Sequence, residues 1–374
     1  MNRIIHLTII LLLGISSLSA QNNKITLRST DNAECIQNDF HSMKANFSFS
    51  SIESVDVETE KGTFSEISIP NTYPSANLGE PALPTIHELL AIPFGAEPQV
   101  VIKNFTIDEY DLDDYGIKRL MPKQMSLRKD QNPEDVEFAY NEAAYQTKSF
   151  ADSPSASIEV TGTMRGIRIG SLIINPVSYN ASENKIRVFN NIEVEVVFSN
   201  ADVEETERML ISTASPYFSI VYNQMFNSKA INDVYDDHPD LWSSPVRMIV
   251  IANDMFEDAL EPWIQWKTEK GFYLDINYTS EIGTTSSDIK TFLQNKYNEG
   301  VQNNETPTFV VIVGDRSQVA ESSMGSATQR VTDLYYGSVD GDYYPDMFYS
   351  RMSAETTTDL TNIINKILQY EQYT

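Results

Sequence analysis

Three apolar runs decide the fold of the second half of this chain: RMIVIA at residues 247–252, YLDINY at 273–278 and TFVVIV at 308–313. After Arg247 and Thr308, the first and the last are unbroken stretches of apolar residues, which is typical of strands buried on both faces. Segments with apolar residues at helical spacing separate the three runs. This β-α-β-α-β order predicts a parallel sheet with helices on its faces.

Two helices are predicted between these strands. The first ends at Gly271, and Pro262 is expected in its first turn, where its missing N–H is tolerated. The second is capped by Ser286 or Ser287 and ends at Gly300.

Two of the predicted strands are followed, after one intervening residue, by an acidic residue, namely Asp254 and Asp315. In parallel sheets the chemistry gathers beyond the carboxyl ends of the strands. Asp315 is therefore a candidate for the floor of an active-site cleft. The alternative is that it simply caps the loop that follows.

The end of the chain holds one more strand and one more helix. A strand is predicted over Met347–Met352, and a helix is expected to be capped near Ser353. Its apolar stripe consists of Leu360, Ile363, Ile364, Ile367 and Leu368. Because this stripe lacks a matched partner, we expect the α/β domain to be completed by sequence beyond Thr374.

The first half of the chain follows a two-residue period instead. Ile192–Phe198 alternates apolar and acidic residues, which indicates a strand with one buried face. Short strands broken by Pro and Gly predict a β-rich antiparallel sandwich or barrel. Residues 128–156 are polar and are expected to form a long loop, and a short helix is expected over Glu204–Leu210.

These patterns divide the chain into four segments. Residues 21–225 form the β-rich domain, and residues 226–245 are predicted to be an exposed, protease-sensitive linker. Residues 246–374 form the incomplete α/β domain. Residues 1–20 are predicted to be a signal peptide, because Arg3 precedes a short apolar run and small residues lead to Ala20 and Gln21, the expected cleavage position.

Composition limits the possible functions. With 53 acidic and 27 basic residues the chain carries a formal net charge of −26, which disfavours binding to nucleic acid or to anionic lipid. No segment after the signal peptide is long and apolar enough to cross a membrane. The single cysteine, Cys35, cannot form an internal disulfide, and no two of the four histidines have the spacing of a helical zinc site.

Several motifs occur in the order found in gingipain-type cysteine peptidases. The α/β half contains Arg247-Met-Ile-Val-Ile251, Trp263-x-x-Trp266-Lys267-x-x-Lys270-Gly271, Phe309–Asp315, Thr332-Asp-x-Tyr-Tyr-Gly337, Asp340-Gly-Asp-x-x-Pro-Asp346 and Arg351-x-Ser353-Ala-Glu355. The β-rich half contains Gly79-Glu-Pro81, Ile92-Pro93, Arg165-Gly166, Asn175-Pro176 and Ile192–Phe198, which resemble the propeptide of that family. The resemblance implies a secreted zymogen in which an inhibitory β-rich prodomain packs on a caspase-like α/β domain that acts on protein or peptide substrates.

The resemblance also implies a catalytic Cys–His pair, in which the thiolate attacks the peptide carbonyl and the imidazole handles the protons. In the family both residues follow later strands of the sheet, which places them beyond Thr374. Cys35 lies in the propeptide region and is not expected to replace the nucleophile. The 374 residues alone are therefore expected to be inactive.

Three further roles are implied by the same resemblance. Asp346 matches an acidic residue that supports the catalytic histidine, with a strand-start turn as the alternative. Asp359 lies near the position that recognises basic substrate residues, with an exposed residue of the first helical turn as the alternative. Asp340 and Asp342 are candidates for a structural calcium site, with a solvated turn as the alternative. No other cofactor is expected.

Two other functions stay open at this point. One is a sortase-like transpeptidase of a bacterial secretion pathway, and the other is a non-catalytic cell-surface β-sandwich protein. A His-Gly and an Ala-Cys segment beyond Thr374 would favour an enzyme, whereas a stop codon there would exclude the dyad.

Overall fold

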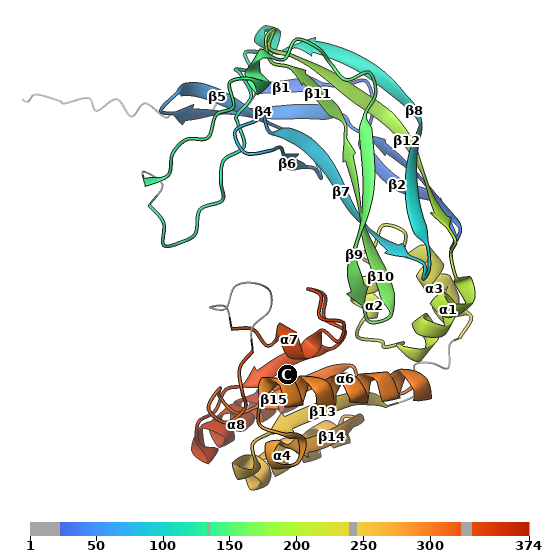
Figure 1. The fold of residues 1–374 in the computed structure, drawn as a ribbon, viewed down its shortest axis with the longest axis vertical. Helices are drawn as coiled ribbons and strands as arrows, with labels where there is room; N and C mark the ends of the chain where they lie inside the picture. Colours follow the sequence, from blue (N-terminus) through green and yellow to red (C-terminus); the bar gives the residue numbers. More distant parts are fainter. Residues whose placement is uncertain (1–22, 133–134, 239–244, 323–330, 374) are drawn as a thin grey trace, which may run out of the picture.

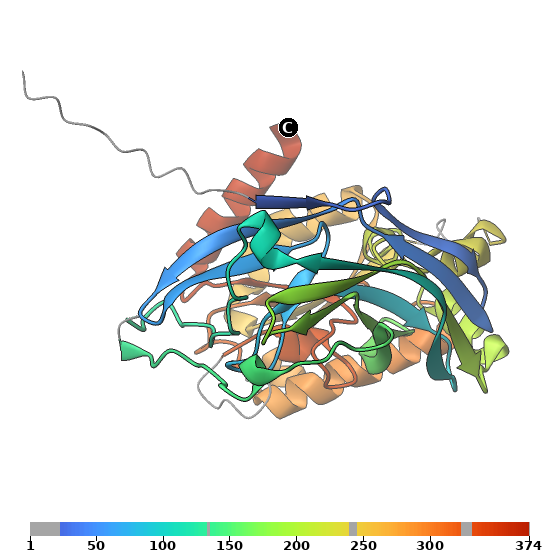
Figure 2. The ribbon, with the colours of Figure 1, turned by 90° about the horizontal axis from the view of Figure 1, so that it is seen from above.

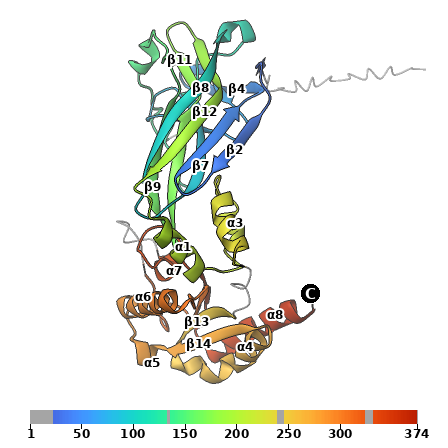
Figure 3. The same ribbon diagram turned by 90° about the vertical axis from the view of Figure 1, so that its right-hand side faces the viewer.

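The computed structural model describes residues 23–132, 135–238, 245–322 and 331–373. The predicted signal peptide and its cleavage position at Ala20 and Gln21 therefore lie outside the described residues. Two modules follow each other along the chain, and Figure 1 shows the strand-rich first module arching over the second. Figure 3 shows the same two modules from the side, joined through helices at the lower end of the strands.

The first module consists of antiparallel sheets, as predicted. One sheet has the order β1-β4-β5, with bounds Asn23–Thr26, Ser51–Thr59 and Gly62–Ser68. A second has the order β6-β7-β10-β9, with bounds Tyr73–Ser75, Leu83–Ile92, Ile167–Asn175 and Ser155–Met164. The third has the order β11-β12-β3-β2, with β8 also paired to β12; the bounds are Val177–Asn180, Lys185–Ser199, Ser42–Ser48, Asn32–Asn38 and, for β8, Glu97–Asp111.

The segment between β8 and β9 contains no strand in its described part. It contains the short 3₁₀ helices η1 (Leu112–Tyr115) and η3 (Ala144–Gln146). Tyr145 is buried, and its hydroxyl donates a 2.6 Å hydrogen bond to the carbonyl oxygen of Leu120. Part of the predicted long loop over residues 128–156 is thus fastened to the core of the first module.

Three helices connect the modules: α1 (Val203–Ser212), α2 (Ser219–Tyr222) and α3 (Lys229–Asp236). The helix expected over Glu204–Leu210 is confirmed by α1. The exposed linker predicted from residue 226 is wrong over α3, because Ala230, Ile231, Val234 and Tyr235 are buried. These residues recur at helical spacing between acidic neighbours, and the acidic neighbours concealed the pattern. Residues 239–244 of that linker lie outside the described residues.

The second module is a four-stranded parallel sheet with the order β14-β13-β15-β16. The strands span Phe272–Tyr278, Val246–Ala252, Phe309–Val313 and Phe348–Met352. Helices α4 (Glu257–Glu269) and α8 (Thr357–Tyr373) cover one face, and α6 (Ser286–Asn303) covers the other. Seen from above, α4 and α8 lie on the opposite side of this module from α6 (Figure 2).

Because the strands are parallel, all of them begin on one side of the sheet and end on the opposite side. We call the side where the strands begin the amino edge and the side where they end the carboxyl edge; neither name refers to the outermost strands β14 and β16. Short elements complete the described part of this module: η5 (Asp254–Phe256) before α4, α5 (Thr279–Ile282) after β14, α7 (Leu334–Gly337) before β16, and the turn into α8.

Helix α6 is capped by Thr285 rather than by the expected Ser286 or Ser287. Apart from this cap, helix ends differ from the sequence prediction at three places. Pro262 lies inside α4 rather than in its first turn, since the helix begins at Glu257. Proline at that place removes one backbone hydrogen bond, and the burial of Leu260 and Trp263 in the core offsets this loss. The final helix is capped not at Ser353 but by Thr356 with Asp359, which exchange backbone and side-chain hydrogen bonds.

The third difference concerns Gly300, which is predicted to end its helix. Helix α6 continues to Asn303 and ends at Asn304, whose φ of 55° is left-handed. A Cβ atom on Gly300 would lie 2.8 Å from the Cα atom of Thr306. Glycine is needed here because the chain returns closely past the helix before it enters β15.

Candidate functional site

The carboxyl edge of the parallel sheet carries the first predicted site residue, Asp315. Its carboxylate accepts a 2.8 Å hydrogen bond from the hydroxyl of Ser353, and its backbone N–H donates to the carbonyl oxygen of Ala354. The hydrogen bond from Ser353, the backbone N–H of Arg316 and the charge of Arg316 lower the pKa of Asp315. The side chain is thus a carboxylate fixed between the ends of β15 and β16.

Asp254, the other acidic residue expected at this edge, follows β13. Its carboxylate accepts hydrogen bonds from the hydroxyl and the backbone N–H of Ser280, which lower its pKa. The prediction that Asp254 and Asp315 lie at the carboxyl ends of their strands is confirmed.

Arg351 organises this edge, and sequence reasoning did not single it out as a site residue. Its guanidinium forms an ion pair with Asp333, at 2.7 and 2.9 Å, in which both carboxylate oxygens accept hydrogen bonds. It also donates to the carbonyl oxygens of Gly314 (2.9 Å) and Val319 (3.0 Å). The ion pair is largely buried, with 13% of the Arg351 side chain exposed. The signals in the sequence were its place within a predicted strand and at the start of the motif Arg351-x-Ser353-Ala-Glu355.

Asp359 is exposed in the first turn of α8. One oxygen of its carboxylate accepts hydrogen bonds from the backbone N–H (3.0 Å) and the hydroxyl (2.7 Å) of Thr356. This is the arrangement of a helix cap. Its expected contact with a substrate side chain stays a prediction.

Asp346 lies at the amino edge, on the far side of the sheet from Asp315. It is 1% exposed, and its two carboxylate oxygens accept backbone N–H bonds from Arg165 at 2.7 Å and Val339 at 2.5 Å. Burial raises the pKa of Asp346 to about 7, although the two N–H bonds favour the ionised form. Both oxygens are occupied in this arrangement, and support of a catalytic histidine stays a prediction.

Asp340 and Asp342, the residues expected at a calcium site, differ in their surroundings. Asp340 is exposed, whereas the Asp342 carboxylate accepts hydrogen bonds from the backbone N–H groups of Thr163 (2.7 Å) and Tyr344 (2.8 Å). In the part of the chain that the structure describes, no group of three His, Cys, Asp or Glu side chains is arranged to hold a metal ion. Calcium takes about six to eight oxygen ligands, which include backbone carbonyls and waters, and the calcium site stays a prediction.

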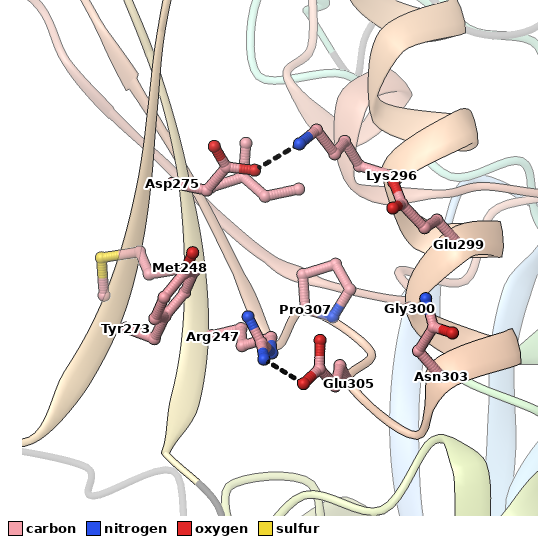
Figure 4. A pocket seen from close by; sticks show the side chains of 11 residues that line it. Arg247, Met248, Tyr273, Asp275, Lys296, Glu299, Gly300, Asn303, Glu305 and Pro307 are labelled. Atoms are coloured by element: carbon pink, nitrogen blue, oxygen red, sulfur yellow. Dashed lines mark ion pairs between the residues drawn. The ribbon is translucent and has the colours of Figure 1, made fainter.

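A pocket of about 190 Å³ lies beside the amino edge, between the sheet and α6 (Figure 4). Arg247 faces Glu305 at 2.6 Å, and Lys296 faces Asp275 at 2.8 Å. The guanidinium of Arg247 also lies over the ring of Tyr273. Both cations of the pocket are thus paired with carboxylates that also line it.

Cys35 is half-buried in β2, in the first module. Burial and the nearby Glu34 raise the pKa of its thiol. A nucleophilic cysteine needs a lowered pKa, so this environment is the opposite of an activated thiol.

Both halves of the chain match models of one family. Residues 23–224 match the model described as Propeptide_C25, and residues 241–374 match Peptidase family C25. The curated protein Lys-gingipain HG66 of Porphyromonas gingivalis is 46% identical over 377 residues, a match that covers 100% of this chain and 22% of that protein. Gingipain R2 of the same species is 23% identical over 338 residues, covering 88% of this chain and 43% of that protein.

Solved structures of gingipains align with parts of the chain. One, described as "Structural insight into zymogenic latency of gingipain K from Porphyromonas gingivalis", is 44% identical, covers 48% of this chain and 100% of that chain, and has a TM-score of 0.46. Another, a complex of the pro- and mature domains of RgpB from Porphyromonas gingivalis, is 18% identical, covers 54% of this chain and 100% of that chain, and has a TM-score of 0.43.

In the part of the chain that the structure describes, no helix has the length and apolar character needed to span a membrane. The chain spans about a fifth of the length of the first curated relatives it matches. The propeptide model covers more than half of the chain, the peptidase model follows it in order, and the two regions coincide with the antiparallel and the parallel module. The chain therefore belongs to the C25 family of gingipain-like cysteine peptidases, of which it holds the propeptide and the N-terminal part of the peptidase domain.

Proposed function

We propose that this chain is the N-terminal part of a secreted cysteine endopeptidase zymogen whose catalytic thiol and imidazole are supplied by sequence beyond residue 374. The observation that carries the proposal is the order of the modules: a propeptide is followed, on the same chain, by a peptidase module against which it packs. The curated relatives are gingipains of a bacterium. The comparisons give no support to a sortase-like transpeptidase or to a non-catalytic surface protein.

The carboxyl edge is the part of the proposed active site that these residues supply. Asp315 and Ser353 form a fixed polar floor at the ends of β15 and β16. Arg351 holds the loops that follow β15 through three carbonyl oxygens and Asp333. We propose that a peptide substrate lies across this edge and that Asp359, at the start of α8, lies near it. Export by the signal peptide, with cleavage after Ala20, is part of the same proposal.

The proposal is tested with the complete gene product. We expect peptidase activity that a thiol-alkylating reagent abolishes and that rises when the propeptide is removed. Peptides with Arg, Lys or an uncharged residue before the scissile bond would define the specificity. A complete product without thiol-dependent cleavage of any of these peptides would refute the proposal.

Cys35 provides the internal control. Residues 21–374 alone are expected to cleave none of these peptides, and Cys35→Ala in the complete product is expected to leave the activity unchanged. Activity of residues 21–374 that Cys35→Ala removes would show that the nucleophile has been placed wrongly.

A further inference from the structure

The β9–β10 hairpin ends in a two-residue turn that is unusual in its sequence. Met164 pairs with Ile167, so that Arg165 and Gly166 form the turn. Both have positive φ, 46° for Arg165 and 76° for Gly166. Tight hairpin turns of this kind favour Asn-Gly or Asp-Gly, and a long side chain with positive φ is strained. Arginine is therefore not explained by the requirements of the turn.

The contacts of the Arg165 side chain provide the explanation. Its side chain is fully buried, and its guanidinium makes five hydrogen bonds, one for each of its N–H donors. Nε donates to Thr213 O (2.7 Å), Nη1 to Pro307 O (2.6 Å) and Asp346 O (3.1 Å), and Nη2 to Thr306 O (3.1 Å) and Thr308 Oγ1 (3.3 Å). Four of these five acceptors belong to the peptidase module.

Aromatic rings complete the site around this side chain. The guanidinium carbon lies 4.8 Å from the ring centroid of Phe218, which follows α1. The ring of Phe218 in turn packs at 4.3 Å on Phe348, the first residue of β16. A buried guanidinium over an aromatic face is held by cation–π attraction as well as by hydrogen bonds. These contacts offset the desolvation of the guanidinium, and they lie at the junction between the two modules.

The strand next to the turn is also shaped for this contact. The backbone N–H of Thr163 donates to Asp342 of the peptidase module, and the hydroxyl of Thr161 lies 2.9 Å from that of Tyr344. A Cβ atom on Gly162 would lie 2.5 Å from an Asp342 oxygen and 2.6 Å from the Tyr344 ring. Gly162 therefore permits a close approach that any side chain would prevent.

The position of these contacts separates them from the proposed chemistry. Thr306, Pro307 and Thr308 precede β15, and Asp346 precedes β16, so the hairpin meets the amino edge. Asp315 lies at the other end of β15, and the five residues of this strand span about 16 Å. The contacts of the β9–β10 hairpin therefore lie at the amino edge and do not reach the carboxyl edge.

We propose that the β9–β10 hairpin is the element by which the propeptide recognises the peptidase module, with Arg165 inserted into a carbonyl-lined socket at the amino edge of the sheet, remote from the active-site edge. This inference rests on the proposed zymogen function for its biological purpose, but it concerns binding and not catalysis. The occupant of the socket is the propeptide of this same chain, continuous with the peptidase module or cut from it.

The test uses the folded chain, with residues 239–244 replaced by the recognition sequence of a site-specific protease. After cleavage, the dissociation of the two pieces is followed by size exclusion and by surface-bound dissociation rates. We expect the wild-type pieces to stay together. Arg165→Lys keeps the charge and the backbone conformation but loses the five-donor geometry, so dissociation should be about 10-fold faster; Arg165→Asn, which suits the turn, should make it about 100-fold faster or more.

Two variants make the outcome specific. Gly162→Ala places a methyl group against Asp342 and should also accelerate dissociation about 10-fold or more. Arg168→Asn is the matched control, because the Arg168 guanidinium bonds to Pro93 O and Ala96 O within the propeptide, and it should leave the dissociation rate unchanged. Circular dichroism of the uncut chains checks that each variant folds.

The proposal is overturned if wild-type pieces separate at once, or if Arg165→Lys, Arg165→Asn and Gly162→Ala all dissociate as slowly as wild type. Equal acceleration by Arg168→Asn would also overturn it, because the effect would then come from general loosening of the propeptide. Since binding is measured without any substrate, a complete gene product that lacks peptidase activity would refute the proposed function and leave this result standing.

Discussion

The buried carboxyl group of Asp346 predicts an unusual dependence of stability on pH. Its ordinary pKa is 3.8, and burial raises it to about 7 in the folded chain. The charged and titratable groups that face it come from both modules: Arg165, Tyr222, Lys290, Tyr297, Asp340 and Asp342. Desolvation disfavours the carboxylate, and the two acidic neighbours add to the effect.

The sign follows from which state binds the proton. Between pH 3.8 and about 7 the folded chain holds a proton on Asp346 that the unfolded chain has released. The contribution of this group to stability is therefore fully present below pH 3.8 and is lost as the pH rises through 7. A shift of about three pKa units corresponds to about 4 kcal/mol. With about 2 cal/mol/K of unfolding entropy per residue over 374 residues, this is about 5 °C in Tm.

The measurement compares wild type with Asp346→Asn between about pH 4 and pH 8. Thermal unfolding is followed by tryptophan fluorescence, since Trp263 and Trp266 both lie in α4 of the peptidase module. Asparagine presents an NH₂ group to one of the two N–H donors, so the variant should be less stable at the acidic end. The wild-type advantage should then shrink by about 4 kcal/mol, or about 5 °C, as the pH reaches about 8.

The control is Asp315→Asn, because hydrogen bonding lowers the pKa of Asp315 instead. The contribution of Asp315 is present above pH 3.8 and is lost as the pH falls further, so its variant should show no corresponding trend over the same pH range. Parallel pH profiles for wild type and Asp346→Asn, or a wild-type advantage that grows with pH, would refute the reasoning about desolvation.

Three further predictions concern the peptidase module. Arg351→Lys should lose the paired hydrogen bonds to Asp333 and lower the free energy of unfolding, measured in urea, by about 2 kcal/mol. It should also lower the activity of the complete product. An unchanged midpoint of urea unfolding would contradict the predicted loss of stability. Partial burial opposes ionisation of Glu371, but hydrogen bonds led by that from Lys267 outweigh it and lower the pKa to about 2. Glu371→Gln should therefore lower the free energy of unfolding by about 1–3 kcal/mol near pH 7 and by much less near pH 2, where wild type has lost this contribution as well. Equal losses at both pH values would exclude a stabilising role of the ionised carboxylate. Gly300→Ala should cost about 1–3 kcal/mol because its methyl group would overlap the loop before β15, and a variant as stable as wild type in urea would show that the loop can move aside.

The sequence by itself determined the succession of an antiparallel β-rich module and a parallel α/β module. Two-residue alternation, as in Ile192–Phe198, and unbroken apolar runs, as in Phe309–Val313, are local patterns that reflect which faces of a strand are buried. The motifs also identified the family, and they placed Asp315 at the end of its strand. Such properties depend on neighbouring residues along the chain, so the order of residues is enough to predict them.

Only the tertiary structure decided at which edge of the sheet each acidic residue lies and whether it is buried there. Asp346 and Asp315 are both strand-flanking aspartates in the sequence, yet Asp346 is buried under the propeptide, whereas Asp315 lies at the opposite edge. Arg165 was visible only as part of a short motif, because its partners lie about 50 to 180 residues away along the chain. The physical reason is that burial, pKa and hydrogen-bond partners arise from long-range packing between modules, which no local pattern encodes.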